Sequence, residues 1–138
     1  MMILGIGTDL VKIERLEQAM TRFQERFIGR IFTPAEQRLC GEGRTRYACY
    51  AKRFAAKESL VKALGVGMRE GIWFTDMEIL NDDYGKPVMT LSGKTERRLH
   101  ALMQAAHFTS VVIHLALSDE GGFALAHLVL EGRNKLIS

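Results

Sequence analysis

The chain contains few of the residues that interrupt or cross-link a protein: two prolines, two cysteines and one tryptophan in 138 residues. It also has no internal repeat, no low-complexity tract and no Pro- or Ser-rich linker. A chain of this length without a linker is expected to form one domain, residues 1–138, with an ordinary hydrophobic core. The spacing of Cys40 and Cys49 matches no zinc or redox motif, so we expect two free thiols in a reducing compartment.

Long hydrophobic runs and a strong charge excess are also missing. The longest apolar runs, such as residues 111–117, are too short to cross a bilayer. The first residues lack a basic segment and are interrupted by Asp9, so they do not resemble a signal peptide. The formal net charge is only +3, which excludes a nucleic-acid-binding arm but is compatible with an anionic substrate or an acidic partner. The sequence therefore predicts a cytoplasmic protein that binds neither membranes nor nucleic acid.

A long helix beginning near Tyr47 is predicted at the centre of the chain, because Ala, Lys, Glu and Leu dominate there and no proline interrupts. Gly65 and Gly67 supply the signal for its end. The apolar residues of this helix fall on one arc, which we expect to be buried: Phe54, Leu60, Val61 and Leu64.

Three charged residues border or enter this arc, and two interpretations are open. Glu58 and Lys62 can form an ordinary helical pair, one turn apart, worth about 0.2–0.5 kcal/mol. Alternatively, the charges belong to a functional site, because burying them without partners is costly. Lys57, inside the arc, favours a site, although a long lysine stem can also reach out of a core.

The N-terminal segment predicts a buried strand followed by a helix. Gly5 and Gly7 in the strand Met2–Gly7 would let another backbone or a ligand approach closely. Asp9 follows this strand and either caps the next helix or binds a hard cation.

The predicted first helix starts near Val11 and continues through Phe27, with apolar residues at helical spacing. If the helix is continuous, Arg15, Arg22 and Arg26 lie on one outer side, whereas a break at Thr21 or Gln24 would turn Arg26 away. Such a stripe is either a solvated face or a docking surface for an acidic protein.

The rest of the chain alternates helices and strands. A capping box at Thr33–Glu36 starts a short helix that reaches about Cys40. Strands at 76–80 and 88–91 flank a turn at 81–87, a helix follows Ser92 to about Ala106, and strands at 109–117 and 123–130 form a terminal hairpin. The predicted fold class is α+β, with a small antiparallel sheet packed against the long central helix.

Three segments of the chain resemble the holo-[acyl-carrier-protein] synthases, the short class of 4′-phosphopantetheinyl transferases. They are residues 3–17, residues 53–72 with the following turn at 81–87, and residues 114–126. The resemblance implies the fold of that family and transfer of the phosphopantetheine arm of coenzyme A to a serine of apo-acyl-carrier protein. It also implies release of adenosine 3′,5′-bisphosphate and a role in fatty acid biosynthesis.

The resemblance further assigns catalytic roles. Asp9 and Glu58 match the family's Mg²⁺ ligands, and Lys62 matches the lysine that stabilises or protonates the departing bisphosphate. Either Glu58 or a metal-bound water then takes the serine proton. Carboxylates suit this role because Mg²⁺ binds a few carboxylate oxygens together with substrate phosphates and water.

Contacts with the two substrates are implied in the same way. Arg53 and the turn Gly85, Lys86 and Pro87 would line the nucleotide end of coenzyme A, and Arg15, Arg22 and Arg26 would meet the acidic carrier. The family forms homotrimers with active sites between subunits and the last hairpin near the coenzyme. Some relatives carry Ser-His where this chain has Ser118-Asp119, which leaves His114 as the candidate histidine of the hairpin.

Without the resemblance, two functions of different class fit the residues. One is a metal-dependent phosphoryl or nucleotidyl transferase that uses Asp9 and Glu58. The other is a non-catalytic module that docks acidic proteins through its arginines.

Overall fold

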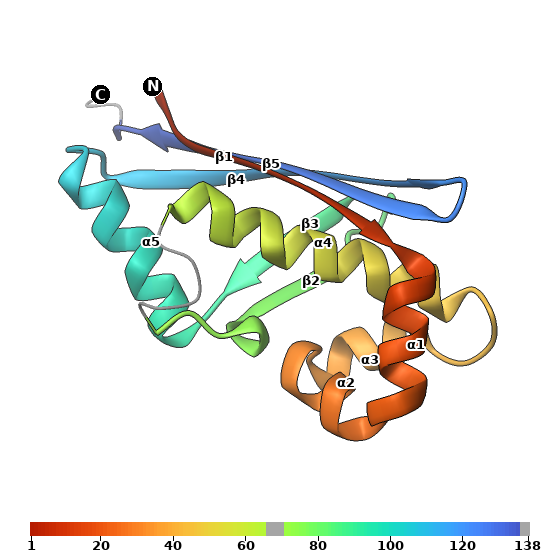
Figure 1. Ribbon diagram of the computed structural model, residues 1–138. Coiled ribbons are helices and arrows are strands. Elements are labelled where there is room, and N and C mark those ends of the chain that lie inside the picture. The colour runs from red at the N-terminus through yellow and green to blue at the C-terminus, as the bar shows by residue number, and fades with distance from the viewer. Residues whose placement is uncertain (66–70, 136–138) are drawn as a thin grey trace.

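The computed structural model describes residues 1–65 and 71–135 (Figure 1). Its elements in chain order are β1 (Met2–Lys12), α1 (Ile13–Phe23), α2 (Glu25–Ile31), α3 (Pro34–Cys40), α4 (Arg46–Leu64), the 3₁₀ turn η2 (Phe74–Asp76), β2 (Met77–Asn81), β3 (Pro87–Leu91), α5 (Gly93–Ala105), β4 (Ser110–Glu120) and β5 (Phe123–Arg133).

Helix α4 is the centre of the molecule, as predicted, and the sheets lie on its sides. One antiparallel sheet has the strand order β1-β5-β4, and β2 pairs with β3 in a separate hairpin. Figure 1 shows α4 between the long sheet and the β2–β3 hairpin, with α1–α3 near one of its ends and α5 near the other. This arrangement confirms the predicted α+β class, and it buries α4 on almost every side.

The predicted buried arc of α4 is confirmed. Leu60, Val61 and Leu64 are buried and Phe54 is half-buried. The helix ends at Gly65, whose φ of 76° is the left-handed conformation expected of a terminal glycine. Gly67 lies outside the described residues.

Gly5 and Gly7 let β1 pack directly on the backbone of α4. A Cβ at Gly7 would overlap the carbonyl oxygen of Ser59, and one at Gly5 would overlap that of Ala63. The predicted close approach is therefore confirmed, and the backbone that approaches is that of α4. This contact fixes the distance between the backbones of β1 and α4 where the two elements cross.

The predicted first helix is not continuous, and of the two possible break points the structure has the one at Gln24. Helix α1 ends at Phe23, Gln24 takes a φ of 49°, and α2 begins at Glu25. Arg26 therefore lies on a different helix from Arg15 and Arg22. A non-glycine residue at positive φ cannot continue an α-helix, and the local sequence carries no glycine or proline to indicate the break.

Strand β1 is longer than predicted, and this changes the interpretation of Asp9. The strand continues to Lys12, which is also the residue before α1, so Asp9 is a strand residue and not a helix cap. Pairing with the long strand β5 explains the extension, because β5 offers a partner for each residue from Gly5 to Lys12. The helix-cap interpretation is therefore wrong.

The remaining elements follow the prediction closely. Both hydrogen bonds of the capping box are present. The N–H of Thr33 donates to Glu36 Oε1 at 2.9 Å, and the N–H of Glu36 donates to Thr33 Oγ1 at 3.2 Å. Ser92 precedes α5 as predicted, but its side chain makes no capping bond. The terminal hairpin is longer than expected, since only Gly121 and Gly122 remain outside its strands.

The expectation of two free thiols is wrong, because Cys40 and Cys49 form a disulfide. The bond joins the end of α3 to the first turn of α4 and closes the loop between them. Sequence spacing could not indicate the pair, since it depends on how the two helices pack.

No helix in residues 1–65 and 71–135 is long and apolar enough to span a membrane.

Candidate active site

Asp9, Glu58 and Lys62 come together where β1 crosses α4. Asp9 lies two residues beyond Gly7 and therefore on the same face of the strand, which faces the helix. The Lys62 ammonium donates to Asp9 Oδ1 at 3.0 Å and to the carbonyl oxygen of Thr8 at 2.9 Å. Lys62 thus forms its ion pair with Asp9 across two elements, while its charge also acts on Glu58 one turn away in α4.

Asp9 and Glu58 line one cleft of about 400 Å³. Its walls come from β1, α1, α2 and α4, and the residues that complete them are Leu10, Val11, Lys12, Arg15, Leu16, Ala19, Phe27 and Phe54. Sequence patterns placed Phe27 and Phe54 on apolar helix faces and gave no sign that these rings would border a polar site.

The two carboxylates repel each other. Burial raises the pKa of Glu58 above its ordinary value, the negative charge of Asp9 raises it further, and the Lys62 ammonium opposes the shift. A site in which one lysine faces two carboxylates favours an additional cation.

The donor set of the cleft suits Mg²⁺. In the part of the chain that the structure describes, no cluster of three or more His, Cys, Asp or Glu side chains forms, so Asp9 and Glu58 are a two-carboxylate set. Mg²⁺ is commonly bound through one or two carboxylates, with substrate phosphates and water completing its shell. Asp9 and Glu58 therefore fit a metal that a phosphate-bearing substrate helps to hold.

The raised pKa of Glu58 predicts a cost to stability. The folded chain binds the Glu58 proton more tightly than the unfolded chain does. The free energy of unfolding therefore falls as pH rises from the ordinary value of 4.5 through the raised pKa.

We expect Glu58→Gln to raise the melting temperature of the metal-free protein by a few degrees at neutral pH, with no gain below pH 4.5. Calorimetry across this range, with exposed Glu17→Gln as the control, measures the difference. Equal midpoints for Glu58→Gln and the native chain at every pH would contradict the repulsion.

The arginines divide between two helices. Arg15 lines the cleft, and Arg22 lies on the same exposed side of α1 with its guanidinium 5.1 Å from the Phe23 ring centroid. Arg26 projects from α2 into a neighbouring groove. Only Arg15 and Arg22 form the predicted continuous stripe.

Arg53 lies away from the cleft, on the side of α4 that faces β2. It is 4% exposed, and its Nε donates to the carbonyl oxygen of Ile79 at 3.0 Å. Its terminal nitrogens lie 3.3 Å from the carbonyl oxygen of Cys49 and from Asn81 Oδ1. The predicted contact of Arg53 with coenzyme A stays a prediction, and within one chain its hydrogen bonds are structural.

The other predicted coenzyme contacts are also outside the cleft. The turn Gly85, Lys86 and Pro87 is largely exposed, and Asp82 Oδ1 accepts from the backbone N–H of Lys86 at 2.9 Å. His114 projects from the face of the sheet opposite α4, and its Nε2 lies 2.9 Å from Glu131 Oε1. Both assignments stay predictions.

Lys57 is not part of the cleft, which corrects the interpretation that it marks a site. Its ammonium donates to Glu36 Oε1 at 2.6 Å and to the carbonyl oxygen of Ile31 at 2.5 Å, and both charged side chains are fully buried. The second oxygen of Glu36 accepts from the N–H of Ile79 at 2.8 Å. This pair ties α2, α3 and β2 to α4, and it places α2 beside the helix that carries Glu58.

Comparisons with known proteins agree on one family. Residues 5–125 match the model of the 4′-phosphopantetheinyl transferase superfamily. The chain is 50% identical to the holo-[acyl-carrier-protein] synthase of Magnetococcus marinus over 133 residues, which cover 94% of each protein. It is 46% identical to the enzyme of that name from Cereibacter sphaeroides over 132 residues, covering 96% of this chain and 95% of the relative.

Solved structures show the same relationship. The holo-(acyl-carrier-protein) synthase of Bacillus anthracis, in complex with CoA (3′,5′-ADP), is 34% identical with a TM-score of 0.74, covering 96% of this chain and 99% of that one. The Helicobacter pylori holo-[acyl-carrier-protein] synthase in complex with coenzyme A is 31% identical with a TM-score of 0.74, covering 91% and 99%. The chain therefore belongs to the 4′-phosphopantetheinyl transferase superfamily of enzymes, among the holo-[acyl-carrier-protein] synthases.

Proposed function

We propose that this enzyme transfers 4′-phosphopantetheine from coenzyme A to a serine of apo-acyl-carrier protein and releases adenosine 3′,5′-bisphosphate. The observation that carries the proposal is the meeting of Asp9 and Glu58 in one cleft, with the Lys62 ammonium paired to Asp9, in a chain from this family. The relatives solved with coenzyme A support coenzyme A as the donor.

The three residues divide the chemistry. Asp9 and Glu58 would hold Mg²⁺, which when bound supplies positive charge to the pyrophosphate. Lys62 already directs its ammonium into this polar site and would stabilise the bisphosphate as its negative charge increases. The serine proton would pass either to Glu58 or to a water beside it.

Mass spectrometry of the carrier tests the function directly. After incubation with coenzyme A, Mg²⁺ and this protein, we expect apo-carrier to gain the mass of one phosphopantetheine. An unchanged carrier mass at saturating coenzyme A and Mg²⁺ would refute the transfer. A non-catalytic docking module, the rival candidate, would bind the carrier without this mass change, and coenzyme A with Mg²⁺ would not raise its melting temperature.

The arginines on α1 are proposed to dock the acidic carrier. Arg15 lines the cleft and Arg22 is exposed two turns further along the same side, so a carrier bound there would present its serine to the cleft. Exposed charge pairs contribute only about 0–1 kcal/mol each, but they steer encounter and weaken as salt rises.

Charge reversal at these positions should weaken carrier binding selectively. We expect Arg15→Glu or Arg22→Glu to raise KM for the carrier severalfold and leave KM for coenzyme A nearly unchanged. Arg26→Glu should have a smaller effect, because Arg26 lies on α2. Steady-state kinetics at several salt concentrations measure both constants. Arg97→Glu, exposed on α5 at the other end of the molecule, is the matched control (Figure 1). Equal carrier KM values in the control and the α1 variants would place docking elsewhere.

A homotrimer with active sites between subunits is also proposed. Alternate residues of β5, such as Ala124 and Ala126, are buried against α4, so Phe123 and Leu125 face away from it. Leu125 pairs with Leu10 of β1, and both are at least 40% exposed. An apolar sheet face of this kind favours association with other subunits. Light scattering that reports an active monomer would refute the trimer.

We further propose that the enzyme acts in the cytoplasm and supplies holo-carrier for fatty acid biosynthesis. The Cys40–Cys49 disulfide is unusual for that compartment, where thiols are normally kept reduced. Thiol labelling of the protein in intact cells tests the location: rapid labelling of both cysteines supports it, and complete protection contradicts it.

A further inference from the structure

Lys62 is held by two acceptors, a carboxylate and a backbone carbonyl. Its ammonium donates to Asp9 Oδ1 at 3.0 Å and to the carbonyl oxygen of Thr8 at 2.9 Å. The Lys62 side chain is 54% exposed, and an exposed ion pair alone does little to fix a long, flexible side chain. The Thr8 carbonyl therefore helps to set the direction of the ammonium. An ammonium has three N–H groups, so these two bonds leave one for a substrate oxygen.

Thr8 faces His127 across β1 and β5, and the two residues form a non-hydrogen-bonded pair of the sheet. They are register partners, and at the end of this register the N–H of Ile13 donates to the carbonyl oxygen of Gly122 at 2.9 Å. Hydrogen-bonded and non-hydrogen-bonded pairs alternate along an antiparallel ladder, and an odd number of residues separates Thr8 from Ile13. The carbonyl of Thr8 is therefore directed to the open edge of β1, where Lys62 reaches it.

A side-chain hydrogen bond joins the two strands at this pair. Thr8 Oγ1 lies 2.7 Å from His127 Nδ1. A hydroxyl can donate to a ring nitrogen or accept from it, so the bond forms in either tautomer of the imidazole. Both side chains point away from α4, because Gly7 and Ala126, their neighbours in β1 and β5, face that helix. His127 thus holds Thr8 from the outer side of the sheet, while Lys62 binds the Thr8 carbonyl from the edge.

The pair also adjoins the apolar face that we propose as the subunit contact. Leu10 and Leu125, the next outward-facing pair of the same two strands, are both at least 40% exposed. A role of His127 in assembly alone would change the molar mass of the protein, whereas a role in positioning Lys62 would change catalysis at constant molar mass.

We propose that His127 is a positioning residue of the transfer reaction: it fixes Thr8, whose carbonyl oxygen directs the Lys62 ammonium toward the departing bisphosphate. This inference rests on the proposed function. Without the hydrogen bond between the two side chains, β1 is free to shift at Thr8, and Lys62 keeps Asp9 but loses a fixed direction. The loss should appear in kcat, because the charge of the bisphosphate increases as it leaves, and much less in KM for coenzyme A.

Substitutions that remove one side of the hydrogen bond test the proposal. Thr8→Val keeps the branched shape without the hydroxyl, and His127→Phe keeps a ring without the nitrogen. We expect each to lower kcat by about fivefold to tenfold, with KM for coenzyme A nearly unchanged. Thr8→Ser and His127→Asn retain hydrogen-bonding groups near the same positions and should restore most of the rate. Thr90→Val, exposed on β3, is the matched control and should keep the native rate. Native kcat values in both Thr8→Val and His127→Phe would overturn the proposal.

A double-mutant cycle shows whether the two residues act through one bond. Because Thr8→Val and His127→Phe break the same hydrogen bond, the double variant should lose no more kcat than either single variant. A multiplied loss would assign independent roles to the two residues and overturn the proposal. So would a lower molar mass by light scattering in both single variants with kcat restored at high protein concentration, since that result would assign the pair to the subunit contact.

Amine labelling of Lys62 gives a readout that does not need turnover. An ammonium held by two acceptors reacts slowly with an acid anhydride, so Thr8→Val and His127→Phe should increase labelling of Lys62 severalfold, measured by mass spectrometry of its peptide. Thr90→Val should leave the labelling at the native level. Unchanged labelling in both Thr8→Val and His127→Phe would overturn the proposal. If the native protein showed this labelling pattern but failed to transfer phosphopantetheine, the proposed function would be refuted and the positioning of Lys62 would stand.

Discussion

Replacing Asp9 or Glu58 by alanine is expected to lower the rate of phosphopantetheine transfer by at least about 100-fold, because each variant loses one of two carboxylates that would hold the metal. The two carboxylates come from β1 and α4 and both line the cleft, and the Lys62 ammonium pairs with Asp9. With one carboxylate left, Mg²⁺ would depend on the substrate phosphates for most of its ligands.

The fold should tolerate both substitutions. Asp9 and Glu58 are half-buried at the edge of the cleft, and removing either one relieves the repulsion that raises the pKa of Glu58. Circular dichroism and the rate of carrier modification at saturating Mg²⁺ separate loss of fold from loss of activity. Calorimetric titration with Mg²⁺ and coenzyme A gives a readout independent of turnover, and binding should weaken in both variants.

Glu17→Ala is the matched control, because Glu17 is an exposed acid on α1 that does not line the cleft. It should keep the activity of the native enzyme. A near-native rate in Asp9→Ala or Glu58→Ala at saturating Mg²⁺ would show that the metal is held by other groups.

Local patterns predicted those parts of the fold that depend on neighbouring residues. The apolar arc of α4, its end at Gly65 and the capping box at Thr33 are each confirmed, because spacing and short-range hydrogen bonds determine them. The meeting of Asp9, Glu58 and Lys62 was expected only from family resemblance. Nothing in periodicity places residues of β1 and α4 in one cleft.

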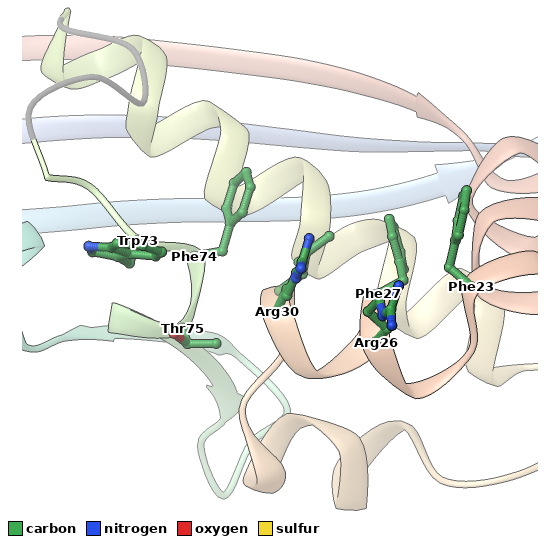
Figure 2. A pocket seen from close by; sticks show the side chains of 8 residues that line it. Phe23, Arg26, Phe27, Arg30, Trp73, Phe74 and Thr75 are labelled. Carbon is green, nitrogen blue, oxygen red and sulfur yellow. The ribbon is translucent and has the colours of Figure 1, made fainter.

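Features that depend on tertiary packing were missed for identifiable reasons. Lys57 was interpreted as a site residue because its partner, Glu36, lies on another helix and only packing brings the two together. The break at Gln24 was only one of two possibilities, because no glycine or proline marks it. The cavity between α2 and the η2 segment combines residues of α1 and α2 with Trp73 and Phe74, which belong to a segment without helical or strand periodicity (Figure 2).

Gly7→Ala is expected to destabilise the protein severely, because β1 and α4 are in backbone contact at this residue. The added Cβ would overlap the carbonyl oxygen of Ser59. That oxygen belongs to the backbone of a buried helix and cannot swing aside as a flexible side chain could. The strand or the helix must therefore move, and overpacking of this kind costs about 3 kcal/mol, near the upper end of what single insertions into a core cause.

The expected loss corresponds to a melting temperature lowered by about 10 °C for a chain of this size. Moving β1 would also move Asp9 relative to Glu58, so transfer activity should fall even at temperatures where the variant is folded. Thermal melting followed by circular dichroism, and transfer rates well below the midpoint, measure the two effects.

Gly29→Ala is the matched control: Gly29 lies within α2, and no atom lies within 4 Å of a Cβ built there. Because alanine favours helix over glycine by about 1 kcal/mol, Gly29→Ala should be neutral or slightly stabilising. If Gly7→Ala melted at the same temperature as Gly29→Ala and kept full activity, β1 could not be packed on α4 at the separation that positions Asp9.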